Sequence, residues 1–191
     1  MDKFFANLWL VVVIGFGLAA VVIALPDYSV APGVSSYGLA TGVMQWLHVF
    51  FGIMWIGLLY YFNFVQTPTM PSIPAELKPG VTRHIVPPAL FYFRWGAALT
   101  VLAGLILAHL YHELDALLFA PGKALIGIGM WLALIMAFNV WAIIWPAQKK
   151  VLGLVEADDA ARARAAKAGL IASRANVLLS IPMLLAMTNF R

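Results

Sequence analysis

The sequence predicts an all-α membrane protein, a polytopic helical bundle with five transmembrane helices. Of its 191 residues, 63% are hydrophobic and only 10% are charged, whereas about a quarter of a typical soluble domain is charged. The mean hydropathy is +0.92. The apolar residues form continuous runs of about 20, the length that a helix needs to cross a bilayer, and not the alternating pattern of a membrane β-barrel. We therefore expect a single helical domain over residues 1–191 in contact with lipid.

Five apolar segments have this length. The first is taken as a retained helix because its apolar core is longer than that of a signal peptide, and no small-x-small cleavage site follows it. The other four are uninterrupted by charged clusters. In chain order the predicted spans are 4–25, 39–64, 88–109, 122–145 and 169–189.

The connections between these spans predict the orientation of the chain. The one between the second and third spans is rich in proline, which argues against regular helix there. The one between the fourth and fifth spans is charged and is expected to carry a short surface helix. Placing both on one side leaves only Lys123 and Arg191 of the twelve Lys and Arg opposite. The positive-inside rule then predicts N-terminus in and C-terminus out, in a bacterial inner membrane.

Two absences from the sequence exclude whole classes of chemistry. There is no cysteine, which rules out disulfides, thiolate metal sites and covalently attached haem within this chain. The eight Asp and Glu residues fall in predicted loops or at helix ends, so no buried proton relay is expected. No nucleotide-binding loop or hydrolase motif is present, and no nucleic-acid partner is expected.

A polar stripe along the second span is the first candidate site. At 100° per residue, five positions fall on one face of the helix: Gln45, His48, Gly52, Trp55 and Asn63. Because lipid cannot satisfy imidazole or amide groups, the stripe should face other helices, a cofactor or a cavity. One interpretation is a b-type haem, with His48 as axial ligand and Gly52 leaving room for the macrocycle. The alternative is that His48 hydrogen-bonds a neighbouring helix and Gly52 permits close packing.

Two residues of the third span extend the haem hypothesis. His109 is the better candidate for a second axial ligand and His112, just beyond the span, is the poorer one; the alternative for each, favoured for His112, is a solvated interfacial histidine. Arg94 either reaches lipid phosphate or holds a carboxylate, such as a haem propionate or an acidic substrate. Two axial histidines would favour electron transfer, whereas one would leave the iron open for catalysis.

Three stretches resemble the integral-membrane domain of the cytochrome-c-type urate oxidase (urate hydroxylase) family. They are LHVFFGIMWIGLLYYFNFVQTP, FYFRWGAALTVLAGLIL and SRANVLLSIPMLLAM. The resemblance implies an outward C-terminus and electron transfer to a periplasmic cytochrome c. It also places seven residues at motif positions: His48, Gly52, Trp55, Asn63, Gln66, Arg94 and Asn176.

Two departures weigh against urate as the substrate. This stand-alone chain carries no cytochrome c domain, and Ala175 and Phe190 stand where the resembling proteins have histidine. We therefore expect a membrane redox protein, an oxidoreductase binding haem b through His48 and passing electrons to a separate periplasmic cytochrome c or membrane partner. The alternative is a non-enzymatic accessory or assembly subunit of a larger respiratory or photosynthetic complex.

Overall fold

The computed structural model describes residues 8–24 and 36–189, and every regular element in these ranges is a helix. The chain divides into two units, residues 1–43 and 44–191, which are described separately. In the first unit, α2 (Leu8–Ala24) is a helix of 17 residues composed almost entirely of apolar side chains. It lies within the first predicted span, of which residues 4–7 and 25 fall outside the described ranges.

Of the described residues, four helical stretches are long and apolar enough to cross a membrane, and the shorter α2 is not among them: Gly38–Ser72, Lys78–Leu110, Ala124–Val151 and Asp159–Asn189. They confirm an all-α protein with several candidate membrane spans. The side of the membrane on which each terminus lies stays a prediction, as does the single domain. At about 1.5 Å per residue, a stretch of 33 residues such as Lys78–Leu110 is about 50 Å long, well beyond the ~30 Å of a hydrocarbon core.

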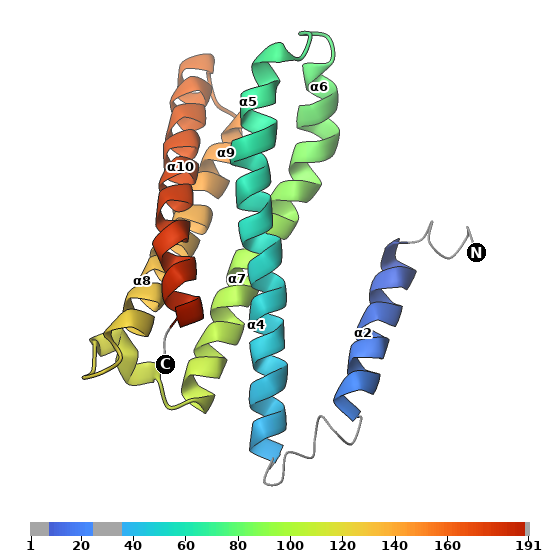
Figure 1. Ribbon diagram of the computed structural model, residues 1–191. Helices are drawn as coiled ribbons and strands as arrows, with labels where there is room; N and C mark the ends of the chain where they lie inside the picture. Colours follow the sequence, from blue (N-terminus) through green and yellow to red (C-terminus); the bar gives the residue numbers. More distant parts are fainter. Residues whose placement is uncertain (1–7, 25–35, 190–191) are drawn as a thin grey trace. The chain divides into compact units, whose positions relative to one another are not determined.

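Three of the four long stretches are built from helical segments of different types, whereas the last is a single α-helix (Figure 1). The first stretch consists of α4 (Ser36–Tyr60), the π-helix η1 (Tyr61–Gln66), α5 (Thr67–Thr69) and the 3₁₀-helix η2 (Met70–Ser72). The second consists of α6 (Lys78–Gly80), the π-helix η3 (Val81–Ile85) and α7 (Val86–Leu110). The 3₁₀-helix η4 (Leu114–Leu118) comes next. The third stretch consists of α8 (Ala124–Phe138), the π-helix η5 (Asn139–Ile144) and α9 (Trp145–Val151), and the fourth is α10 (Asp159–Asn189).

Two expectations about the connections are wrong. The proline-rich segment between the second and third spans is helical up to Ser72 and again from Lys78. The charged segment before the fifth span does not form a separate surface helix, because its second half is the beginning of α10. Helices thus extend well past the apolar runs.

The π-helices explain how the helices continue through proline. Each π-helix ends two residues before a proline, namely Pro68, Pro87 and Pro146. Proline lacks the N–H that would bond the carbonyl four residues earlier, and its ring collides with that carbonyl. In a π-turn the bond reaches one residue further, as the Trp145 N–H does to the Val140 carbonyl. In the wide turn, bonding to the carbonyl four residues earlier is not needed, and the proline ring no longer collides with that carbonyl.

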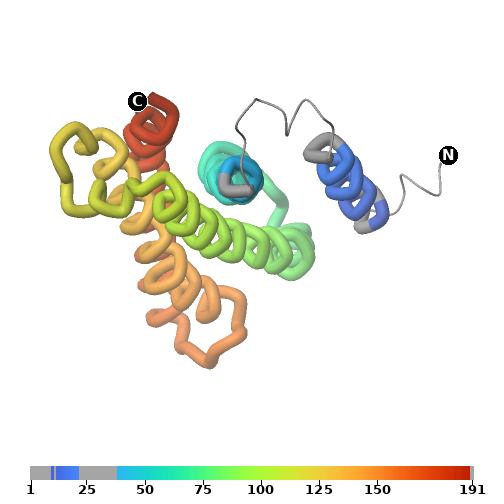
Figure 2. The backbone as a smooth tube through the Cα atoms, turned by 90° about the horizontal axis from the view of Figure 1, so that it is seen from below, coloured from blue at the N-terminus to red at the C-terminus, as the bar shows by residue number. Residues whose placement is uncertain are grey.

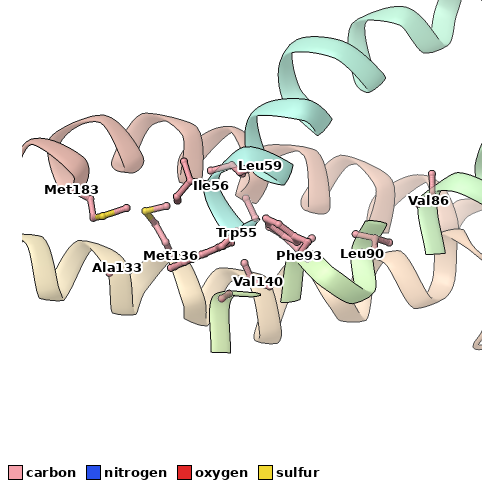
Figure 3. Close-up of a cluster of buried hydrophobic side chains, with 13 residues drawn as sticks. Trp55, Ile56, Leu59, Val86, Leu90, Phe93, Ala133, Met136, Val140 and Met183 are labelled. Carbon is pink, nitrogen blue, oxygen red and sulfur yellow. The ribbon is translucent and has the colours of Figure 1, made fainter. Parts of the chain in front are cut away.

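The core of the second unit lies between α4, α7, α8, η5 and α10 (Figure 3). Trp55 and Leu59 are fully buried there, together with Phe93 and Met136. A methyl group at Gly96 of α7 would lie 3.3 Å from the backbone nitrogen of Trp55, so the two helices approach closely at this point. In lipid such contacts stabilise the bundle through dispersion and fit and not through release of water.

Amide and hydroxyl side chains hold the last helix to its neighbours. Asn139 donates to the Asn176 carbonyl oxygen at 2.8 Å, and Asn176 donates to the Met136 backbone carbonyl at 3.0 Å. The Tyr60 and Ser180 hydroxyl oxygens are 2.9 Å apart. Figures 1 and 2 show α8 beside α10, with the connections from α5 to α6 and from α9 to α10 at one end of this unit.

Candidate functional site

His48 of α4 is hydrogen-bonded to the neighbouring helix α7. Its Nδ1 lies 2.9 Å from the Thr100 backbone carbonyl, and because a carbonyl only accepts, Nδ1 carries the proton and donates it. The neutral ring then has an unprotonated Nε2, which is the form of histidine that ligates metals. The half-buried ring fits over Gly104, where a Cβ atom would lie 2.8 Å from its Cε1.

Gly52 and Trp55 pack against α7 on the same face of α4. A Cβ at Gly52 would lie 3.8 Å from the Thr100 methyl group, so ordinary helix contact takes up the space on this side. Trp55 is fully buried in the core, and its Nε1 has no hydrogen-bond partner. Gln45 accepts a hydrogen bond from the Tyr111 hydroxyl at 2.9 Å. These residues of the stripe thus contact other parts of the bundle, which is one of the alternatives predicted for them.

The two other predicted site residues, His109 and Arg94, lie elsewhere in the bundle. His109 is exposed in the last turn of α7, whereas His48 contacts α7 at Thr100 and Gly104. No group of three or more His, Cys, Asp or Glu side chains is arranged to hold a metal ion within the described ranges. The donor at His48 is thus its single unprotonated ring nitrogen, Nε2.

Arg94 stacks on an aromatic ring instead of pairing with an acid. The centre of its guanidinium is 3.7 Å from the centroid of the Trp145 ring and 5.6 Å from that of Phe91. This cation–π contact stabilises a charge at a half-buried position without neutralising it. Arg94 takes part in none of the ion pairs found among the described residues, so its planar N–H donors remain free for an anion.

A cavity of about 350 Å³ lies at the end of the unit where the two long connections meet. Its walls come from the helices around all three π-helices. Apolar side chains predominate, and Gln66, Thr67, Thr82, Gln148 and Ser173 supply the polar ones. The lining residues are Phe62, Gln66, Thr67, Met70, Thr82, Val86, Leu90, Phe93, Ile144, Gln148, Val151, Leu152, Ala166, Gly169, Leu170 and Ser173.

Two side-chain oxygens at this end are buried without a partner: Oε1 of Gln66, which lines the cavity, and Oδ1 of the neighbouring Asn63. The orientation of the Asn63 amide is determined, because its Nδ2 donates to the Leu59 carbonyl at 2.8 Å and to the Ser173 hydroxyl at 2.7 Å. Unsatisfied buried acceptors are uncommon and costly, about 1–3 kcal/mol each. Of these two acceptors, Gln66 Oε1 belongs to a residue that lines the cavity, where a ligand could satisfy it.

An ion cluster closes the opposite end of the unit, between α7 and α8. The Lys123 ammonium lies 2.7 Å from Asp115 Oδ1 and 3.2 Å from Glu113 Oε2, and it also donates to the His112 carbonyl. The hydrogen bond with Lys123 lowers the pKa of Asp115, and that with Asp115 raises the pKa of Lys123. The cluster joins η4 to the start of α8 and has the features of a structural contact.

Comparison with known families bears on the second half of this unit. The model of the family described as "Urate oxidase N-terminal" covers the helices α8, α9 and α10. Residues 110–190 match the urate oxidase N-terminal family. No curated protein and no solved structure matches the chain significantly. The family resemblance is thereby confirmed for this region, and no cytochrome domain is found in the 191 residues.

The matched residues, 110–190, contain the Asn139–Asn176 pair and the α9 and α10 walls of the cavity. It does not include His48, Gly52, Trp55, Arg94 or His109. Sequence reasoning on periodicity alone missed the cavity, because its polar residues come from four separate segments. Gln66 is the exception, since the family resemblance implied that it occupies a motif position.

Proposed function

We propose that the chain is a membrane redox protein, an oxidoreductase of the urate oxidase type that exchanges electrons with a separate periplasmic or membrane-bound partner. The observation that carries this proposal is the family match over residues 110–190 in a chain with four candidate membrane spans. The haem, the substrate and the partner are not identified by that match. The proposal therefore depends on what His48 does.

We further propose that His48 holds a b-type haem through Nε2. The bond from Nδ1 to the Thr100 carbonyl supports this proposal, because histidine ligands commonly donate their other ring nitrogen to a carbonyl, which fixes the tautomer and strengthens the ligating nitrogen. Gly104 lets the ring keep this position. Haem supplies one-electron chemistry when it is bound. A single histidine would leave one side of the iron accessible, which favours catalysis over simple electron transfer.

An optical spectrum of the purified protein tests this proposal. The reduced-minus-oxidised difference should contain the α-band of a b-type cytochrome, and His48→Ala should abolish it while His109→Ala should retain it. Circular dichroism and gel filtration of both variants serve as the folding control. A spectrum without an α-band, after expression with sufficient haem supply, would contradict haem binding. Equal haem content in wild type and His48→Ala would exclude His48 as the ligand.

A second candidate function is a non-enzymatic accessory subunit of a larger membrane complex. It is favoured by the use of the predicted site in helix packing, since Gly52 and Gly104 both face side chains across the α4–α7 contact. Purification under native conditions separates the two functions. Stable co-purification of a defined complex, with no haem and no loss of assembly in His48→Ala, would support the accessory function and contradict the redox proposal.

A further inference from the structure

The cavity at the end of the unit that holds the α5–α6 and α9–α10 connections is lined by residues other than those around His48. In the first long stretch the cavity is lined by Phe62 and Gln66 of η1, which follow His48 and the rest of α4. In α7 it is lined by Val86, Leu90 and Phe93. His48 instead contacts α7 at Thr100 and Gly104. A volume of about 350 Å³ falls in the range of small-molecule sites.

The walls of the cavity select a neutral ligand with an apolar body. None of its lining residues is charged, so an ionised ligand would lose hydration without gaining a partner of opposite charge. Phe62 and Phe93 form part of the wall and meet edge to face, with ring centroids 5.7 Å apart. Aromatic walls of this kind favour a flat ring in the site.

The polar groups of the cavity select a ligand that donates hydrogen bonds. Gln66 Oε1 is a buried acceptor without a partner, and a ligand hydroxyl reached by rotation of the Gln66 amide would satisfy it. Ser173 accepts a hydrogen bond from Asn63, so its own proton can be donated to a ligand oxygen. A molecule that fits both residues carries a hydroxyl group, which both donates and accepts.

We propose that this cavity binds the head group of a hydroquinone, a flat, neutral, lipid-soluble ring with hydroxyl donors. Its ring packs between the apolar walls, and one hydroxyl donates to Gln66 while accepting from Ser173. Hydroquinones are membrane-soluble electron carriers, so the site goes beyond the redox proposal by assigning a second ligand to the chain. It requires no haem, and the two proposals can fail separately.

The test is anaerobic titration calorimetry of the full chain in detergent with 2,3,5-trimethylhydroquinone and with the corresponding benzoquinone, which has no donor. The hydroquinone should bind wild type more tightly than the quinone does. Gln66→Leu should weaken hydroquinone binding about tenfold, as expected for loss of one buried hydrogen bond, and should leave quinone binding nearly unchanged. Leu170→Trp, which fills the cavity from an exposed position, should weaken both.

Gln45→Leu is the matched control, because it makes the same chemical change at the other end of α4, where Gln45 bonds Tyr111. It should leave both affinities unchanged. Three results would overturn the proposal: hydroquinone binding that is equal in wild type and Gln66→Leu, a Gln45→Leu effect as large as that of Gln66→Leu, or no measurable hydroquinone binding. Binding of urate that depends on Gln66, with no hydroquinone binding, would overturn the ligand assignment.

Discussion

At the scale of single residues, the best-defined contact in the predicted site is between an imidazole and a glycine. His48 donates to Thr100 and lies over Gly104, where any larger side chain would meet its ring. This position of the ring is needed whether His48 binds haem or only joins two helices. Gly104 is therefore as important to the site as His48 itself, although the periodicity of α4 gave no reason to select it.

Gly104→Ala should move the imidazole, because the new methyl group would lie 2.8 Å from His48 Cε1 and 2.9 Å from Nδ1. We expect a loss of about 1–3 kcal/mol in the free energy of unfolding, the usual range for overpacking. Gly57→Ala is the control, since nothing lies within 4 Å of its Cβ position and alanine favours helix. Unfolding in mixed detergent measures both. Equal stability of the two variants would contradict the packed position of the ring.

The ion cluster between the end of α7 and the start of α8 gives a prediction for pH. The hydrogen bond from Lys123 lowers the pKa of Asp115 in the folded state, so the contact contributes stability above the unfolded pKa of aspartate, near about 3.9. This contribution is lost as the pH falls through the lower folded value. Thermal unfolding followed from pH 7 downward should show this loss in wild type.

Asp115→Asn is the control for that measurement, because its amide does not titrate. The variant should be less stable than wild type at neutral pH, and the difference should shrink at low pH and at high salt, which screens an exposed pair. A difference that stays constant across the pH range would show that Asp115 acts through something other than its charge.

At the scale of elements, proline does not end these helices but changes their type. Pro68, Pro87 and Pro146 each follow a π-helix, and the N–H of the residue before each proline bonds the carbonyl five residues earlier. Residues from all three π-helices line the same cavity. The three proline-associated turns thus lie around one cavity.

Removing a wide turn should be tolerated only when its proline is removed too. Deletion of Ala142, an exposed residue of η5, takes away the extra residue of the π-turn and leaves Pro146 in ordinary α-helix. We expect a loss of about 3 kcal/mol in the free energy of unfolding. Combining the deletion with Pro146→Ala should recover most of it. A deletion that is equally tolerated with and without the proline would contradict this explanation of η5.

The same elements show what could be predicted from sequence. Apolar run length placed all four long helices, because it reports directly on the cost of polar groups in lipid. Helical periodicity along the second span put Gln45, His48 and Asn63 on one face, and each of them bonds a residue outside that span. The prolines were misread, because their effect depends on hydrogen bonds elsewhere in the helix. The cavity was missed because its walls meet only through tertiary packing.

At the scale of the whole molecule, the long helices carry the basic connections to one end and η4 to the other (Figure 1). Grouping most Lys and Arg residues at one end agrees with the assumption behind the predicted orientation. The positive-inside rule then places the cavity end towards the cytoplasm. This orientation can be tested directly, because the chain contains no cysteine.

Single cysteines at two exposed positions should report the orientation. Leu118 lies in η4, and Leu154 lies in the connection between α9 and α10. A membrane-impermeant maleimide applied to intact spheroplasts should label Leu118→Cys, and should label Leu154→Cys only after the membrane is disrupted. The cysteine-free parent shows the background. The reverse labelling pattern would overturn the predicted orientation while leaving the fold unaffected.

The Asn139–Asn176 pair bears on the order in which the chain is assembled during synthesis. Because each amide is satisfied within the hairpin formed by the last two spans, that hairpin can enter lipid with both amides already matched. Asn63, made much earlier, can bond the Leu59 carbonyl of its own helix at once, but it reaches its second partner, Ser173, only when α10 arrives. The second span is therefore fully paired only after the last helix has been inserted.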